Sequence, residues 1–265
     1  MRMMTIASGS SGNCIYVGSD NAHILIDSGI SRKRIMEGLA VAGLSLKDIS
    51  AIFITHEHSD HIKGLDVISR KDEIPVYATK GTIEGIIGSG IMKDSRTELF
   101  NEVCAGQDIL IKDLSVRPFT ISHDANEPVA YTVGNNGKKI GIATDLGFYD
   151  DYTVENLKDS DALLVEANHD VNLLQVGSYP YYLKQRILSN RGHLSNEASG
   201  RLIDSVLNDK IKHIFLGHLS KENNYDKLAF ETVRLEIDMS DSCYKAADFD
   251  IEVAKRSENS DIIMV

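Results

Sequence analysis

The distribution of apolar residues along the chain predicts short strands that alternate with amphipathic helices. Short runs rich in β-branched and aromatic residues predict strands at residues 3–6, 14–17, 22–26, 51–55, 75–78, 109–111, 116–119, 130–133, 139–144, 161–166, 211–216 and 249–253. Helical spacing predicts helices from Ser31 to near Gly43 and at residues 62–71, 79–90, 179–191, 196–207 and 222–238, with Ser31 and Ser195 as N-caps. Because strands and helices mix in two similar halves, we expect a layered α/β fold.

The length of 265 residues and the hydrophobic content of 42% permit a sizeable core, in one large domain or two tightly fused halves. No linker divides the chain, so we expect a single domain over residues 1–265. The polar tail at about residues 256–265 is expected to be mobile, despite its apolar end Ile262–Val265.

Composition and charge limit the cellular location and the kinds of binding site that the sequence predicts. No apolar run approaches the roughly 20 residues that span a bilayer, and the start lacks a signal-peptide core, so we expect a cytoplasmic protein without membrane contact. Three widely spaced cysteines argue against a disulfide framework and against a Cys-x-x-Cys zinc site. The net charge of −11 by itself argues against nucleic-acid binding, but bound metals and a local basic patch can supply positive charge for a nuclease.

The densest candidate chemistry is the hexad His56-Glu57-His58-Ser59-Asp60-His61, directly after the predicted strand 51–55. Four potential metal ligands start from one rigid strand end, so they can converge on a common point. Imidazole and carboxylate groups suit zinc, manganese or iron. A solvated polar loop is the competing interpretation.

Other strand ends carry further candidates. His123 and Asp145 each follow a predicted strand, and His218 follows the strand 211–216. Asp27 ends the strand 22–26, where a carboxylate can accept an N–H from a liganding histidine and fix its tautomer. An ordinary strand-end aspartate that begins a turn, and a core or surface histidine at position 123, are the alternatives.

Candidate phosphate contacts lie in three segments. The small residues of the loop 8–13, with Ser11 and Asn13, can bring backbone N–H groups near a phosphate or a metal, although a plain hairpin turn explains them equally well. His169 follows the strand 161–166 and is either part of the site or its lip. Three cations, Lys184, Arg186 and Arg191, precede the candidate catalytic residue His193 and are candidates for binding a phosphate. A solvated helix face is the alternative interpretation.

The hexad matches the HxHxDH motif of the metallo-β-lactamase superfamily, and the ordered set with His123, Asp145 and His218 resembles the superfamily's pattern over the whole chain. The resemblance implies an αββα sandwich. It also implies one ion held by His56, His58 and His123, a second held by Asp60, His61 and His218, a bridging Asp145, and support of the hexad by Asp27.

Several stretches resemble more closely the YycJ subgroup, also called WalJ or VicX. They are residues 7–14, 55–65, 166–170 and 192–197. Members of that subgroup are regarded as 5′→3′ DNA exonucleases linked to mismatch repair, which implies DNA as substrate and protein partners in repair. A β-lactamase of the common zinc type has Cys where Asp145 stands, and a flavodiiron reductase normally has Glu in place of His58.

The expected reaction is hydrolysis of a phosphodiester by a hydroxide that two divalent ions share. His193, oriented by Glu166, is expected to contact the scissile phosphate or to protonate the leaving oxygen, and Asp60 joins them as a candidate catalytic residue. Two alternatives stay open. One is an ester or thioester hydrolase for small molecules with the same metals, and the other is a non-catalytic binding protein that retains the fold.

Overall fold

The computed structural model describes residues 1–92 and 96–265. By its internal contacts the chain forms two compact units. Unit 1 consists of Met1–Thr120, Ala125–Gly137 and Lys255–Val265, and unit 2 consists of Ile121–Asp124 and Lys138–Ala254.

The main sheet of unit 1 has the strand order β14-β1-β2-β3-β4-β5-β6. Strands β1, β2 and β3 pair antiparallel, whereas β3, β4, β5 and β6 run parallel, so the ends of β3 and β4 meet at one edge of the sheet. The strands are β1 (Arg2–Ala7), β2 (Cys14–Gly18), β3 (His23–Ile26), β4 (Ala51–Phe53), β5 (Val76–Ala78), β6 (Phe100–Glu102) and β14 (Ile263–Met264).

Helices cover this sheet and close a core. Ile35 and Leu39 of α1, Ile68 of α3 and Ile86 of α4 belong to one buried apolar cluster with Ile52 of β4. Ser31 caps α1, because its side chain accepts a hydrogen bond from the Arg34 N–H, as the sequence predicts. The helical segments of unit 1 are α1 (Arg32–Val41), η1 (Leu46–Asp48), α2 (Ser59–Ile62), α3 (Leu65–Asp72), α4 (Lys80–Gly88) and η2 (Thr97–Leu99).

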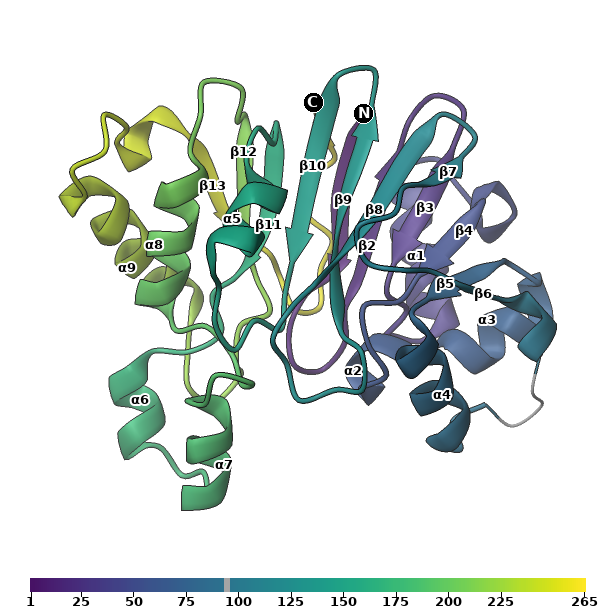
Figure 1. The fold of residues 1–265 in the computed structure, drawn as a ribbon, viewed down its shortest axis with the longest axis horizontal. Helices are drawn as coiled ribbons and strands as arrows, with labels where there is room; N and C mark the ends of the chain where they lie inside the picture. Colours follow the sequence, from purple (N-terminus) through teal and green to yellow (C-terminus); the bar gives the residue numbers. More distant parts are fainter. Residues whose placement is uncertain (93–95) are drawn as a thin grey trace. The chain divides into compact units, whose positions relative to one another are not determined.

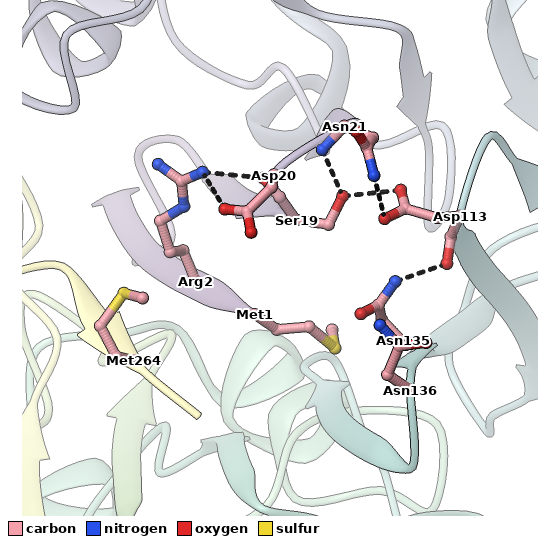
Figure 2. Close-up of a pocket in the computed structure, with 9 residues that line it drawn as sticks. All are labelled: Met1, Arg2, Ser19, Asp20, Asn21, Asp113, Asn135, Asn136 and Met264. Carbon is pink, nitrogen blue, oxygen red and sulfur yellow. Dashed lines mark hydrogen bonds and ion pairs between the residues drawn. The ribbon is translucent and has the colours of Figure 1, made fainter.

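Three further strands of unit 1 form an antiparallel meander, β7 (Ile109–Ile111), β8 (Leu114–Thr120) and β9 (Val129–Asn135). The turn between β7 and β8 is bonded to the turn between β2 and β3 around a cavity of about 160 Å³ (Figure 2). There Asp113 accepts hydrogen bonds from Ser19 Oγ at 2.7 Å and Asn21 Nδ2 at 3.1 Å, and its carbonyl accepts one from Asn135 at 2.7 Å. The polar groups that line this cavity form hydrogen bonds with one another. They hold the two turns together.

Unit 2 is built on four parallel strands in the order β13-β12-β11-β10. Helices α8 and α9 pack against each other beside these strands (Figure 1). The strands are β10 (Lys138–Ala143), β11 (Ala162–Glu166), β12 (His213–Gly217) and β13 (Asp250–Val253), and the helical segments are α5 (Asp151–Leu157), α6 (Val171–Val176), α7 (Tyr181–Ile187), α8 (Asn196–Val206), α9 (Asp226–Met239) and η3 (Ala246–Asp248).

Several local features differ from the sequence-based expectations. The helix expected at 62–71 begins only after a break at Gly64, as α3, and α5, α6 and β6 were not expected. The tail, for which we expected mobility, returns to unit 1, where β14 pairs with β1 and Ser260 Oγ accepts a hydrogen bond from Thr5 N at 3.0 Å. Its apolar end therefore supplies an edge strand. Within the part of the chain that the structure describes, no helix is both long and apolar enough to cross a bilayer.

Candidate metal centre

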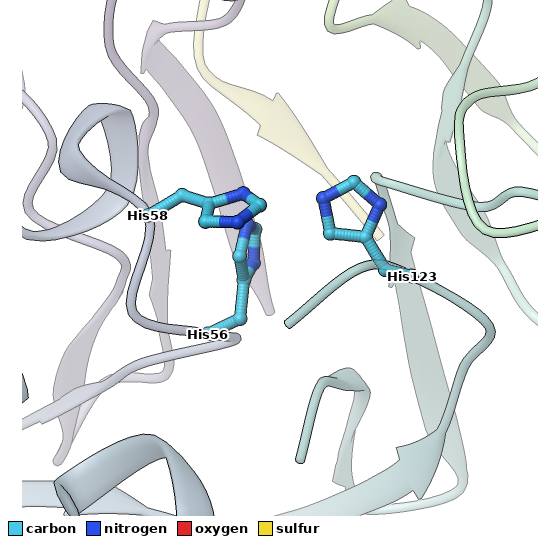
Figure 3. A group of neighbouring side chains, drawn as sticks. All are labelled: His56, His58 and His123. Atoms are coloured by element: carbon cyan, nitrogen blue, oxygen red, sulfur yellow. The ribbon is translucent and has the colours of Figure 1, made fainter. Parts of the chain in front are cut away.

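The hexad leaves the buried end of β4 and turns into α2, with His58 at the helix N-cap. The ring centroids of His56 and His58 lie 4.6 Å apart (Figure 3), and those of His56 and His61 lie 4.1 Å apart. His56 and His61 are fully buried. The single helical turn thus gathers three imidazoles at the edge of the sheet where β3 and β4 end.

Asp27 holds one of these imidazoles in place. Its Oδ2 lies 2.7 Å from His61 Nδ1, and its Oδ1 accepts a hydrogen bond from Thr55 N at 2.9 Å. Because a carboxylate accepts only, His61 carries its proton on Nδ1 and presents Nε2 as a ligand atom. Asp27 reaches this position with a φ of 63°, a left-handed backbone that only a few non-glycine residues adopt.

The loop after β1 lies against the same hexad. Asn13 N donates to the carbonyl of Asp60 at 2.8 Å, and Asn13 Nδ2 lies 3.1 Å from His61 Nε2. Gly29 completes the contact, because a Cβ at that position would lie 1.6 Å from the Asp60 carbonyl oxygen. Of the two loop residues proposed to bind phosphate, Asn13 is buried beside the ligands and Ser11 is exposed.

In unit 2 a second cluster surrounds Asp145. Its Oδ1 lies 3.5 Å from His218 Nε2, and 3.7 Å from both His123 Nε2 and His193 Nδ1. Ligand atoms of Asp145, Glu166, His193 and His218 all lie within 4.8 Å of one another. Asp145 and His218 also have left-handed backbones, with φ of 62° and 54°.

Glu166 is the buried anchor of this cluster. Its Oε1 lies 2.7 Å from His193 Nδ1 and 3.1 Å from His218 Nδ1, and its Oε2 accepts a hydrogen bond from Leu146 N at 2.8 Å. Burial alone would raise the pKa of Glu166, but the charges and hydrogen bonds of the two histidines hold that pKa well below its usual range. The expected pair of Glu166 and His193 therefore lies in direct contact, and both imidazoles present Nε2.

The contact between Glu166 and His218 was not predicted from the sequence. A further contact that we did not expect is that of Asn168, whose Nδ2 donates to the His218 carbonyl at 2.9 Å. The polar run that follows the strand 161–166 was the available signal, but sequence gives no distance between residues some fifty positions apart.

The three cations expected near His193 are all engaged by neighbouring groups. Lys184 Nζ donates at 2.7 Å to each of the carbonyls of Gln175 and Gly177 at the end of α6. Arg186 pairs with Asp124, and Arg191 donates to the His123 carbonyl at 3.2 Å. These contacts fix α7 and the His123 loop, so phosphate binding by these cations remains a prediction.

His169, the further candidate phosphate contact, is only 1% exposed. Burial lowers its pKa to about 4, against the opposing effect of the Glu166 and Asp170 carboxylates. The imidazole is therefore neutral at pH 7 and offers a phosphate no positive charge.

Comparison with known proteins identifies the family. The model of the beta-lactamase superfamily domain matches residues 22–212, a range that includes the hexad, Asp145 and Glu166. The chain belongs to the β-lactamase superfamily. As a superfamily member it is a metal-dependent hydrolase, which confirms the expected class of enzyme.

Two similar superfamily members share most of their length with this chain. Exodeoxyribonuclease YycJ of Bacillus anthracis is 41% identical over 232 residues, which make up 86% of each protein. Exodeoxyribonuclease WalJ of Streptococcus pneumoniae is 39% identical over 239 residues, 89% of this chain and 88% of the relative. The resemblance to the YycJ subgroup is confirmed.

Two solved structures show the same fold. The metallo-β-lactamase fold protein YhfI of Bacillus subtilis aligns with a TM-score of 0.69 at 14% identity, over 98% of both chains. The short form of human tRNase Z aligns with a TM-score of 0.64 at 16% identity, over the full length of both chains. These alignments confirm the expected α/β sandwich of the metallo-β-lactamase type.

Proposed function

We propose that this hydrolase is a 5′→3′ DNA exonuclease that uses two divalent metal ions. The main support is its identity of about 40% with the two relatives named exodeoxyribonucleases, over nearly the whole of both chains. The observation within the molecule that carries the proposal is the strand-end cluster of Asp145, Glu166, His193 and His218. A cytoplasmic location and partners in DNA repair belong to the same proposal.

The donor atoms fit such ions. Imidazole nitrogen and carboxylate oxygen suit zinc, manganese and iron, and two of the imidazoles have Nδ1 bound to a buried carboxylate, as metal-binding histidines usually do. In the scheme that we propose, His56, His58 and His123 would hold one ion, Asp60, His61 and His218 would hold the other, and both would share Asp145. Two divalent ions bound there would lower the pKa of water toward neutrality and offset charge on the phosphate.

His193 is proposed to protonate the leaving oxygen. Glu166 holds His193 Nδ1 at 2.7 Å, which fixes the ring and leaves Nε2 to contact the substrate. Asn13, whose side chain lies beside His61, is proposed to contact the phosphate.

A nuclease assay with two labels tests activity and polarity together. Metal-loaded protein is incubated with DNA labelled at the 5′ end or at the 3′ end, and in parallel with a panel of small esters. Early release of labelled mononucleotide from 5′-labelled DNA, abolished by His58→Ala, is the expected result. Turnover of an ester with intact DNA would instead favour the small-molecule hydrolase.

The role of His193 requires a separate experiment, because His193 lies within the same cluster as Asp145 and His218. His193→Ala should keep the metal content of the wild type and lose at least about a hundredfold in turnover, the usual contribution of a general acid. Loss of one metal equivalent would make His193 a ligand and contradict the proposed role.

A further inference from the structure

Unit 1 contains a groove of about 560 Å³ between α1 and α3, which we call the α1–α3 groove. Its volume lies in the range of pockets that bind small ligands. Met36 and Val67 give it an apolar floor, and Met36 is 42% exposed. Such exposed apolar surface in a concave site is typical of a surface that binds a partner or substrate.

Positive charge lines this groove. Four cations, Arg32, Lys33, Lys63 and Lys71, face one lining carboxylate, Glu37, in a chain whose net charge is −11. Neither Lys63 nor Lys71 has an ion-pair partner within residues 1–92 and 96–265. Arg32 is held by Asp72 at 2.6 Å, and Lys33 lies 3.7 Å from Glu37 in an exposed pair that contributes little. The groove therefore offers two unpaired ammonium groups to an anion.

The first turn of α1 adds to this positive potential. It carries Arg32, Lys33 and Arg34 and no acidic residue, although the positive end of the helix dipole disfavours cations there. A local arrangement that opposes helix stability is expected where function requires it. A bound anion would relieve both the charge repulsion and the unfavourable dipole.

The α1–α3 groove lies next to the metal-binding hexad in the same unit. Lys63 lies two residues after the hexad. Ser31 lies four residues after Asp27, the residue that holds His61 of the hexad. Gly64 N donates to the Ser28 carbonyl at 2.8 Å, and a Cβ on Gly64 would lie 2.1 Å from the Ile30 carbonyl oxygen. The two segments that form the groove are therefore packed tightly together at the sheet edge that holds the hexad.

We propose that the α1–α3 groove binds one nucleotide unit of the DNA strand beside the scissile phosphodiester. Lys63 and Lys71 contact its phosphates, and the sugar and base lie on Met36 and Val67. The proposal rests on the proposed nuclease function. DNA fits better than an acidic peptide, because Lys63 follows the hexad closely in the chain and a DNA strand presents regularly spaced phosphates.

The test compares Lys63→Gln/Lys71→Gln with a control of equal charge, Lys47→Gln/Lys227→Gln, whose lysines are exposed and lie outside the groove. On a single-stranded 20-mer with added manganese, we expect the groove variant to raise KM at least tenfold and to lower kcat less than threefold. Its plot of log KM against log salt should flatten by about 1.4, the value for two phosphate contacts on a single strand. The control should match the wild type.

Three further measurements identify the cause of any defect. Lys63→Arg/Lys71→Arg should restore the salt slope, which a merely structural role would not predict. Met36→Gln should raise KM with an unchanged slope. The defect of the groove variant on DNA should exceed its defect on bis(p-nitrophenyl) phosphate at least tenfold, because so small a diester cannot reach from the metals into the groove.

Each contrary outcome has its own meaning. If the wild type degrades DNA and the groove variant has the slope of the control, the groove proposal is wrong and the nuclease function stands. If the variant instead loses binding of a fluorescent glutamate-rich peptide while its DNA kinetics match the control, the groove binds an acidic partner. If the wild type does not degrade DNA, both proposals fall.

Discussion

At the scale of single residues, the buried Asp27 holds the ring of the candidate ligand His61. It is 1% exposed and receives hydrogen bonds from Thr55 while it holds His61 Nδ1. Asp27→Asn should keep the left-handed backbone, which Asn tolerates, but remove the charge that makes His61 a strong ligand. We expect metal affinity to fall by about 10- to 100-fold, measured by competition with a chromogenic chelator. An affinity equal to that of the wild type would make Asp27 a purely structural residue.

His169 is expected to make stability depend on pH. Its pKa is about 4 in the folded protein and 6.5 in an ordinary environment, so between these values the unfolded chain binds more protons. The free energy of unfolding should therefore be highest above pH 6.5 and fall as the pH is lowered toward 4, by about 3 kcal/mol from this residue.

The matched variant for this prediction is His169→Gln, which cannot take up a proton. Urea unfolding of both proteins at several pH values measures the effect. The difference in stability between wild type and variant should change by about 3 kcal/mol between pH 7 and pH 4. If the unfolding free energies of wild type and variant changed in parallel with pH, His169 would have the same pKa in the folded and the unfolded protein, and the prediction would be wrong.

At the scale of elements, the contact between Gly29 and the hexad loop sets how the ligands are presented. A methyl group at Gly29 would overlap the Asp60 carbonyl, so Gly29→Ala must displace the loop. We expect a loss of about 2–3 kcal/mol in stability, as for other overpacked sites, and weaker metal binding. Gly88→Ala in α4 is the control, because a Cβ at Gly88 would have no neighbouring atom within 4 Å. This substitution should leave stability unchanged or raise it by up to about 1 kcal/mol.

These elements also explain what the sequence could and could not predict. Periodicity located the strands that carry the hexad, His123, Asp145 and His218, because buried strands are short apolar runs that end at polar residues. The break at Gly64 depends on the close approach of the Ile30 carbonyl, and the role of β14 depends on its pairing with β1. Such contacts join residues distant in sequence, so no local pattern reveals them.

The same limit applies to the surroundings of the cations of α7. The closeness of Lys184 to His193 in sequence predicts phosphate binding, but it does not reveal the contacts of the Lys184 ammonium group with two carbonyls at the end of α6. Conversely, Lys63 and Lys71 lie eight positions apart in sequence, and no pattern along the chain marks them as a pair. Only the folded chain brings them together on one groove.

At the scale of the whole molecule, metal binding should control stability as well as activity. An ion that binds only the folded state at a concentration of about 1,000 Kd stabilises it by about 4 kcal/mol, which for a chain of this size corresponds to a shift in Tm of about 10 °C. We therefore expect a chelator to lower the Tm by this order, measured by scanning calorimetry, and addition of manganese or zinc to restore it.

The two units allow this prediction to test the proposed ligand scheme. His58 belongs to unit 1 and Asp145 to unit 2. If both units supply ligands to shared ions, His58→Ala and Asp145→Ala should each lower the Tm in the presence of metal and reduce the further effect of the chelator. If the ions were bound by unit 2 alone, only Asp145→Ala would do so, because His58 would then have no part in the stability that metal confers. A chelator effect of wild-type size in His58→Ala would thus refute the shared site while leaving the family assignment intact.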